Sequence, residues 1–78
     1  MANATRFHEW LKTELAARGF HEWGGMSAFA RQCGVHASVV SRALNGRAVP
    51  EIDVLRRFGH VLGRTLGEML VAAGVAEP

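Results

Sequence analysis

The sequence contains a single cysteine, Cys33, and no run of apolar residues close to the ~18 that a membrane-spanning helix needs. One cysteine excludes a disulfide bond within the chain, whereas secreted domains of this size usually depend on several. The first residues also lack the basic-then-apolar pattern of a signal peptide. These absences predict a cytoplasmic protein without a membrane anchor.

Patterns that support catalysis or metal binding are also missing. The sequence has no glycine-rich phosphate loop, no pair of carboxylates suited to acid–base chemistry and no recognisable set of Ser, His and Asp. Cys33 and His36 have the spacing of two metal ligands, but a structural zinc site usually shows two such pairs. We therefore expect no enzyme, no metal and no cofactor, and we interpret Cys33 as a small core side chain.

What the sequence does contain is the composition of a small globular domain. The chain has 78 residues, of which 49% are hydrophobic, and this apolar fraction argues against disorder. Its length is well below the size at which chains split into two domains, so we expect residues 1–78 to form one domain. A core this small also leads us to expect self-association.

Hydrophobic spacing predicts helices and no strands. Phe7, Leu11 and Leu15 recur every four residues, as they would along one face of a helix. No segment alternates between polar and apolar residues as a half-buried strand would. We therefore predict an all-α fold with five helices, at about residues 4–18, 26–33, 36–44, 51–62 and 66–73.

Glycine and capping patterns mark the ends of these helices. Gly19 follows the first helix, and Asn45-Gly46 follows the third, where a left-handed residue commonly ends a helix. Thr65 followed three residues later by Glu68 forms a capping box for the last helix.

Positive charge is concentrated in the middle of the sequence, although the net charge is only +2. Residues 24–50 contain Arg31, Arg42 and Arg47 and no acid, whereas basic residues do not outnumber acidic ones on either side. A basic surface without nearby carboxylates attracts a polyanion, because its contacts to phosphates add up. Charge alone leaves open a chance clustering of three arginines.

Residues 26–46 have the pattern of two short helices joined by a tight turn. Gly34 lies at the junction, where a residue without a Cβ adopts a positive φ at little cost. Ala30 is small enough to let the second helix cross the first closely, and Val35 is expected to point back into the core. This arrangement is typical of a helix-turn-helix.

The second helix of this pair separates its residues into two faces. The apolar face holds Val39, Val40, Ala43 and Leu44, and the other face holds Ala37, Ser38, Ser41, Arg42 and Asn45. Short hydroxyl side chains let a helix approach base edges, and an arginine can bind the O6/N7 edge of guanine. We interpret this face as a DNA-reading surface that fits the ~12 Å major groove. The alternative is a small polar surface without a ligand.

Together these features resemble the Xre-like (Cro and phage-repressor) helix-turn-helix family. The resemblance covers about residues 26–73 and the first helix. It rests on Phe29-Ala30, Gly34-Val35, Val40-Ser41-Arg42, Asn45-Gly46-Arg47, Pro50-Glu51-Ile52, Leu55, Leu62-Gly63, Leu66 and Glu68-Met69-Leu70. It implies a lambda-repressor-like fold whose third helix enters the major groove of double-stranded DNA, often in a dimer on an inverted repeat.

The resemblance also implies roles for individual residues. Those expected to read bases are Ala37, Ser38, Ser41 and Arg42, and those expected along the DNA backbone are Met26, His36, Asn45, Gly46 and Arg47. Met26 stands where the family often has a phosphate-binding glutamine, so only its backbone N–H can make that contact. The connection before it is longer than usual in the family, which leaves the role of residues 20–25 open, including a DNA contact by His21.

The last predicted helix is apolar on more than one side, which indicates a contact with a second molecule. The simplest such contact is a homodimer through Leu66, Met69, Leu70 and Ala73. The resemblance then implies a repressor that occupies an operator. It leaves open another class of function, a protein-binding module on the same fold such as an antitoxin. DNA reading needs Arg42, whereas partner binding through the last helix does not.

Two tryptophans, Trp10 and Trp23, could in principle stack on bases. We interpret both as core or loop anchors instead, because single aromatic residues in a small helical domain usually serve packing.

Overall fold

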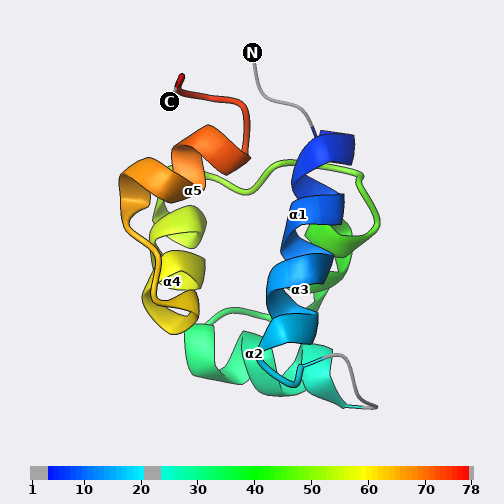
Figure 1. Ribbon diagram of the computed structural model, residues 1–78. Helices are drawn as coiled ribbons and strands as arrows, with labels where there is room; N and C mark the ends of the chain where they lie inside the picture. The colour runs from blue at the N-terminus through cyan, green and yellow to red at the C-terminus, as the bar shows by residue number, and fades with distance from the viewer. Residues whose placement is uncertain (1–3, 21–23, 78) are drawn as a thin grey trace.

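The computed structural model describes residues 4–20 and 24–77. These residues form five helices and no strands: α1 (Ala4–Ala17), α2 (Gly25–Cys33), α3 (Ala37–Leu44), α4 (Ile52–Leu62) and α5 (Leu66–Ala72). α2 crosses one end of the molecule, α1 and α4 both run toward that end along the chain, and α5 lies toward the opposite end (Figure 1). The predicted all-α fold is confirmed, and every helix end lies within one residue of its predicted position.

Local hydrogen bonds explain where two of the helices begin. Thr65 Oγ1 accepts a hydrogen bond from the backbone N–H of Glu68 (3.1 Å), and the Glu68 carboxylate accepts one from the Thr65 N–H (2.9 Å). The predicted capping box of α5 is therefore present. His36 caps α3 with its ring instead of forming the first helical residue, so this helix begins at Ala37.

Side chains from all five helical regions meet in one hydrophobic core. The ring of Phe29 lies at its centre, 5.0 Å from the ring of Phe58 and 5.4 Å from that of Phe20, measured between ring centroids. Burial of this apolar surface is the main force that holds the helices together. The buried members are Phe7, Leu11, Leu15, Phe29, Ala30, Cys33, Val40, Ala43, Leu55, Phe58, Leu62, Met69 and Ala73.

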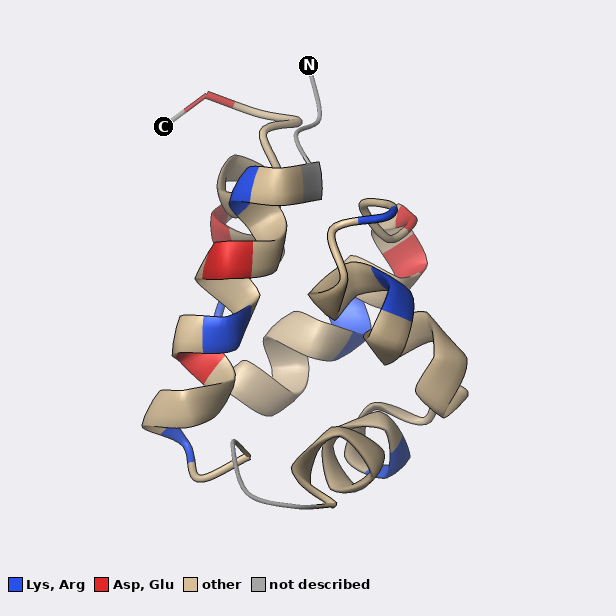
Figure 2. Ribbon diagram, turned by 90° about the vertical axis from the view of Figure 1, so that its right-hand side faces the viewer, with Lys and Arg blue, Asp and Glu red and all other residues tan. Residues whose placement is uncertain are grey.

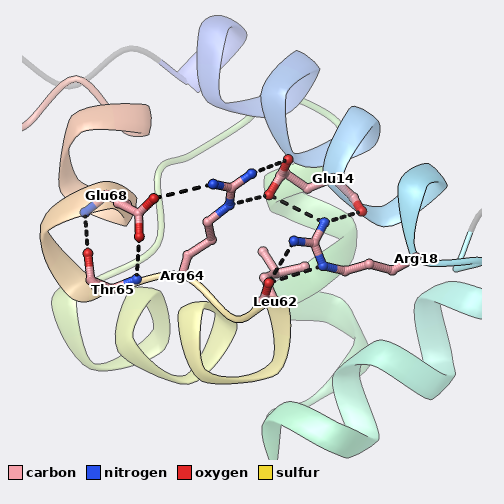
Figure 3. Close-up of polar contacts among 6 residues, drawn as sticks. All are labelled: Glu14, Arg18, Leu62, Arg64, Thr65 and Glu68. Carbon is pink, nitrogen blue, oxygen red and sulfur yellow. Dashed lines mark hydrogen bonds and ion pairs between the residues drawn. The ribbon is translucent and has the colours of Figure 1, made fainter.

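A polar network ties α1 to the corner between α4 and α5 (Figure 3). Arg64 donates to the Glu14 carboxylate through Nε (2.7 Å) and Nη2 (3.1 Å), and through Nη1 to Glu68 (3.2 Å). Arg18 donates to the Leu62 carbonyl through Nε (3.1 Å) and Nη2 (2.7 Å). Glu14 is only 8% exposed, so its charge needs these partners. The sequence pattern did not indicate this network.

α5 packs closely against α4 and turns part of its apolar surface inward. Met69 and Ala73 are fully buried, so the prediction that they form a dimer contact is wrong: both side chains fill the core of the monomer. Leu66 and Leu70 are half-buried and keep some surface. A Cβ on Gly59 would lie 2.8 Å from the Arg64 carbonyl oxygen and 2.9 Å from Met69 Cγ, so this approach requires glycine.

Candidate nucleic-acid interface

α3 presents its predicted polar face at the surface of the molecule. The helix packs against α1 and α2 and buries Val40 and Ala43. All four residues predicted to read bases keep accessible surface: Ala37, Ser38, Ser41 and Arg42. Ser38, Ser41 and Arg42 lie together beside one hollow, whereas Ala37 also packs against the core.

The turn before α3 is held by backbone geometry and by α4. Gly34 has a φ of 72° and ends α2, as predicted, with its N–H donating to the Arg31 carbonyl at 3.1 Å. The side chain of Val35 packs against the core. Arg57 of α4 reaches the same turn, where its Nη1 donates to the Cys33 carbonyl at 3.5 Å. These contacts set the angle at which α3 leaves α2.

A hollow beside α3 brings together residues predicted for both kinds of DNA contact. Its volume is about 460 Å³, and its lining residues, none of them acidic, are Ser38, Ser41, Arg42, Asn45, Arg47 and Ala48. The Arg47 N–H donates to the Arg42 carbonyl at 3.1 Å, which folds the loop after α3 back toward the helix. The Asn45 side-chain amide donates to Ser41 Oγ at 3.3 Å. Ala48 is the one lining residue that the sequence pattern did not indicate.

Three residues predicted along the DNA backbone lie outside the lining of this hollow: Gly46, His36 and Met26. Gly46 has a φ of 67° and makes the turn that leads into Arg47. His36 Nδ1 accepts a hydrogen bond from the Ser38 N–H at 3.1 Å and so caps α3. Met26 is 37% exposed in the first turn of α2, whose N-cap Gly24 supplies no capping side chain. In general, the N–H groups in the first turn of a helix have no partner within the helix and can bind an anion.

Arg42 and Arg47 beside α3 differ from three arginines elsewhere in the fold. Acidic and basic residues alternate along α1, whereas α2 and α3 carry arginines and no acid (Figure 2). In the described part of the chain, Arg42 and Arg47 make no ion pair, while Arg18, Arg57 and Arg64 each contact a carboxylate. No described carboxylate therefore neutralises the positive charge of Arg42 and Arg47, which suits a negatively charged ligand.

Two other side chains considered as possible functional groups, Cys33 and Trp10, pack in or against the core. Cys33 is buried in the core, as predicted, and burial raises the pKa of its thiol to about 11. Trp10 stacks on Phe7 with ring centroids 5.8 Å apart, which fits its interpretation as an anchor. Trp23 and His21 lie outside the described residues.

The described residues contain neither a cluster of metal ligands nor a membrane-spanning helix. Within 4–20 and 24–77, no three His, Cys, Asp or Glu side chains gather closely enough to hold a metal ion. No helix in these same ranges combines the length and the apolar character that crossing a membrane requires.

The comparison with known families matches the region that contains this surface. A family model described as helix-turn-helix matches residues 22–69, which is more than half of the chain. Comparisons with the curated proteins and with the solved structures found no match. The matched residues include α2, the turn at Gly34, α3 and the whole lining of the hollow. The chain therefore belongs to the Xre/Cro-type helix-turn-helix family of DNA-binding regulators, with a lambda-repressor-like fold.

Proposed function

We propose that this protein recognises one specific DNA sequence by placing α3 in the major groove, and that it represses transcription by occupying an operator. The observation that carries the proposal is the hollow beside α3. It joins short hydroxyl side chains to two arginines that form no ion pair with any described carboxylate. Short side chains let the helix approach the bases, and free guanidinium groups can bind guanine edges or phosphates.

The residues divide into two roles in this proposal. Base edges are read by Ala37, Ser38, Ser41 and Arg42, and Arg42 is the member long enough to bind guanine in two places. The DNA backbone is held by the side chains of His36, Asn45 and Arg47 and by backbone groups at Gly46 and Met26. Met26 takes part through its N–H at the start of α2.

A symmetric homodimer completes the proposal. A single α3 reads few base pairs, and two copies related by a two-fold axis would read the two halves of an inverted repeat. Leu66 and Leu70 of α5 keep part of their surface, and Val75 just beyond α5 is half exposed. These three apolar side chains support a dimer contact on this side of the molecule.

Selection of bound sequences from a random DNA pool, at about 150 mM salt to suppress non-specific binding, tests the proposal. We expect an enriched inverted repeat whose half-site centres lie about 34–36 Å apart. An enriched single half-site would support DNA reading and contradict the dimer. A pool that shows no enrichment would contradict sequence-specific binding.

A protein-binding role on the same fold is a second candidate, and one observation favours it. A groove of about 690 Å³ lies between α1 and α5, and its lining includes Trp10, Val71 and Ala72. If the protein keeps its regulatory activity with Arg42→Ala, on the DNA-reading face, but loses it with Val71→Glu, in the groove, this candidate is favoured. The reverse pattern would favour DNA reading.

A further inference from the structure

We infer that His36 decides which chemical groups of DNA Ser38 can read, because it turns the Ser38 hydroxyl into an acceptor for the amino groups of bases. The inference rests on the proposed function, since it takes Ser38 as a base-reading residue. In this inference His36 is a positioning residue, because its ring orients the hydroxyl group of Ser38. Both side chains are exposed, and Ser38 lines the hollow that contains Arg42.

Two contacts of the His36 ring involve the same nitrogen atom. Nδ1 lies 3.1 Å from the backbone nitrogen of Ser38 and 2.8 Å from Ser38 Oγ. A backbone N–H can only donate, so Nδ1 must offer a lone pair and the ring proton must lie on Nε2.

An unprotonated Nδ1 also sets the direction of the second contact. A hydrogen bond between Nδ1 and Oγ takes its hydrogen from the Ser38 hydroxyl, because Nδ1 has none to give, and the N–H and the hydroxyl of Ser38 then share the one lone pair of Nδ1. The Ser38 oxygen then has only lone pairs left for a ligand. It can accept from the N6 amino group of adenine or the N4 amino group of cytosine, but it cannot donate to the carbonyl oxygens of guanine or thymine.

The neighbouring hydroxyl of Ser41 is not restricted in this way. Its partner is the side-chain amide of Asn45, whose Nδ2 lies 3.3 Å from Ser41 Oγ. An amide can turn over and exchange its nitrogen and oxygen, so Ser41 is able to accept or to donate. A serine without a fixed partner reads either kind of group. The restriction of Ser38 therefore comes from the backbone N–H that fixes the His36 ring.

The protonation state of the ring can be measured without DNA. Long-range ¹H–¹⁵N correlation spectra of the labelled full chain at about pH 7.5 separate protonated from unprotonated ring nitrogens. The His36 signals are assigned by their loss in His36→Asn. We expect a proton on Nε2 and none on Nδ1. A ring that carries its proton on Nδ1 would overturn the inference whatever the chain binds.

The second experiment deletes single groups from the selected DNA site. A repeat of the selection with Ser38→Ala identifies the base pair that Ser38 reads, since that position should lose its preference. At that base pair, replacing adenine by purine or cytosine by 2-pyrimidinone removes the amino group. We expect this to weaken binding by the unaltered chain about three- to tenfold, as the loss of one hydrogen bond does, and to leave Ser38→Ala unaffected. Removal of the purine N7 acceptor by a 7-deaza base should not change the Ser38 contact.

Two variants of His36 separate its positioning role from its capping role. His36→Asn keeps a side-chain oxygen that can accept from the start of α3, so it should keep the requirement for the amino group. His36→Ala also removes a proposed backbone contact and the cap of α3, so it should bind the unmodified site more weakly. Removing the amino group should then cause no additional loss of affinity. Circular dichroism of both variants confirms that the helices are intact.

The outcomes distinguish this inference from the proposed function. A requirement for the amino group that survives His36→Ala would overturn the role of His36. If Ser38→Ala changes the base preference at no position of the site, the assigned hydrogen-bond direction is overturned. It is also overturned if the 7-deaza base weakens binding and removal of the amino group does not. In both cases the enriched site itself still supports DNA reading. If no sequence is enriched, the proposed function fails and this readout fails with it.

Discussion

At the scale of single residues, the arginines fall into two groups with different expected effects. Arg64 binds the buried carboxylate of Glu14, and Arg18 binds the backbone carbonyl of Leu62. The N–H groups that make these contacts are therefore used within the fold. Arg42 and Arg47 line the hollow beside α3 and make no ion pair with any described residue. Loss of the first kind should lower stability, whereas loss of the second kind should lower affinity for DNA.

Arg42→Ala should weaken binding to the selected DNA site by about 1–3 kcal/mol and relax the preference at one base position. The reason is that a guanidinium bound to a guanine edge makes two hydrogen bonds that no other base offers. Titration of labelled DNA gives the affinity, and a repeated selection gives the preference. Lys12→Ala removes an exposed cation from α1 and serves as the control. An unchanged preference with Arg42→Ala would show that the reading face is assigned incorrectly.

Arg47→Ala should weaken binding to specific and unrelated DNA alike. A contact to phosphate carries no sequence information, and its loss should lower the slope of log affinity against log salt by about one unit. Affinities measured over a range of salt concentrations check this. A change in base preference, with the salt slope intact, would place Arg47 at a base instead of a phosphate.

Cys33 should react slowly with thiol reagents while the protein is folded. Burial raises the pKa of its thiol to about 11, so near pH 8 the reactive thiolate is scarce and the sulfur is also enclosed by the core. The rate should rise steeply as denaturant opens the core. A small free thiol at the same pH provides the reference rate. Labelling of the folded protein at that reference rate would contradict the burial of Cys33.

At the scale of helices, the contact of α4 with α5 depends on a position without a side chain. Gly59 is buried, and the backbone at Arg64 and the side chain of Met69 occupy the space that a Cβ would need. Gly67 of α5 is also helical, but a Cβ there would meet only Thr65 Oγ1 at 3.8 Å, an ordinary contact distance. The two glycines therefore form a matched pair.

Gly59→Ala should destabilise the fold by about 1–3 kcal/mol, because the extra carbon forces α4 and α5 apart. Gly67→Ala should stabilise it by up to about 1 kcal/mol, because alanine has a lower conformational entropy in the unfolded chain and favours a helix. Urea unfolding of both variants measures the difference. Equal effects from the two substitutions would show that α4 and α5 do not meet as described.

At the scale of the whole molecule, the network at Glu14 joins the N-terminal helix to the C-terminal part of the fold. Arg64 lies fifty positions further along the chain and contacts both Glu14 and Glu68. The hydrogen bond from Arg64 lowers the pKa of Glu14, against the opposing effect of burial, and the charge of Arg18 lowers it further. The N–H of Thr65, followed by Arg64, lowers the pKa of Glu68.

Stability should therefore decrease in acid. A carboxyl whose pKa is lower in the folded state than its ordinary value of about 4.5 stabilises the fold fully above that pH. This stabilisation disappears as the pH falls through the lowered pKa of the folded state. Denaturant unfolding between about pH 6 and pH 3 should show the loss.

Glu14→Gln removes the titrating group while it keeps one acceptor oxygen. The variant should be less stable than the unaltered chain near neutral pH, and the two should converge in acid. Glu9→Gln removes an exposed carboxylate from the same helix and is the control. A constant difference between Glu14→Gln and the unaltered chain across this pH range would contradict the role given to Glu14.

The helices, their limits and the polar face of α3 could be predicted from the sequence, because each depends on residues within a turn or two of one another. The capping box at Thr65 and the turn at Gly34 are local signals of this kind, and the structure contains both. The face of α3 follows from the helical repeat alone. Even here the cap of α3 was missed, since a histidine is not among the usual capping residues.

The sequence could not show which apolar residues of α5 face inward, or which charges meet. Met69 looks like a residue of an exposed stripe, yet Gly59 opens a space on α4 that it fills. Glu14 looks like an ordinary surface acid until the chain folds back and places Arg64 beside it. The spacing of residues along a sequence indicates only which side chains are neighbours on the same helix. Contacts between helices depend on how their surfaces fit together in three dimensions, and that fit exists only once the core has formed.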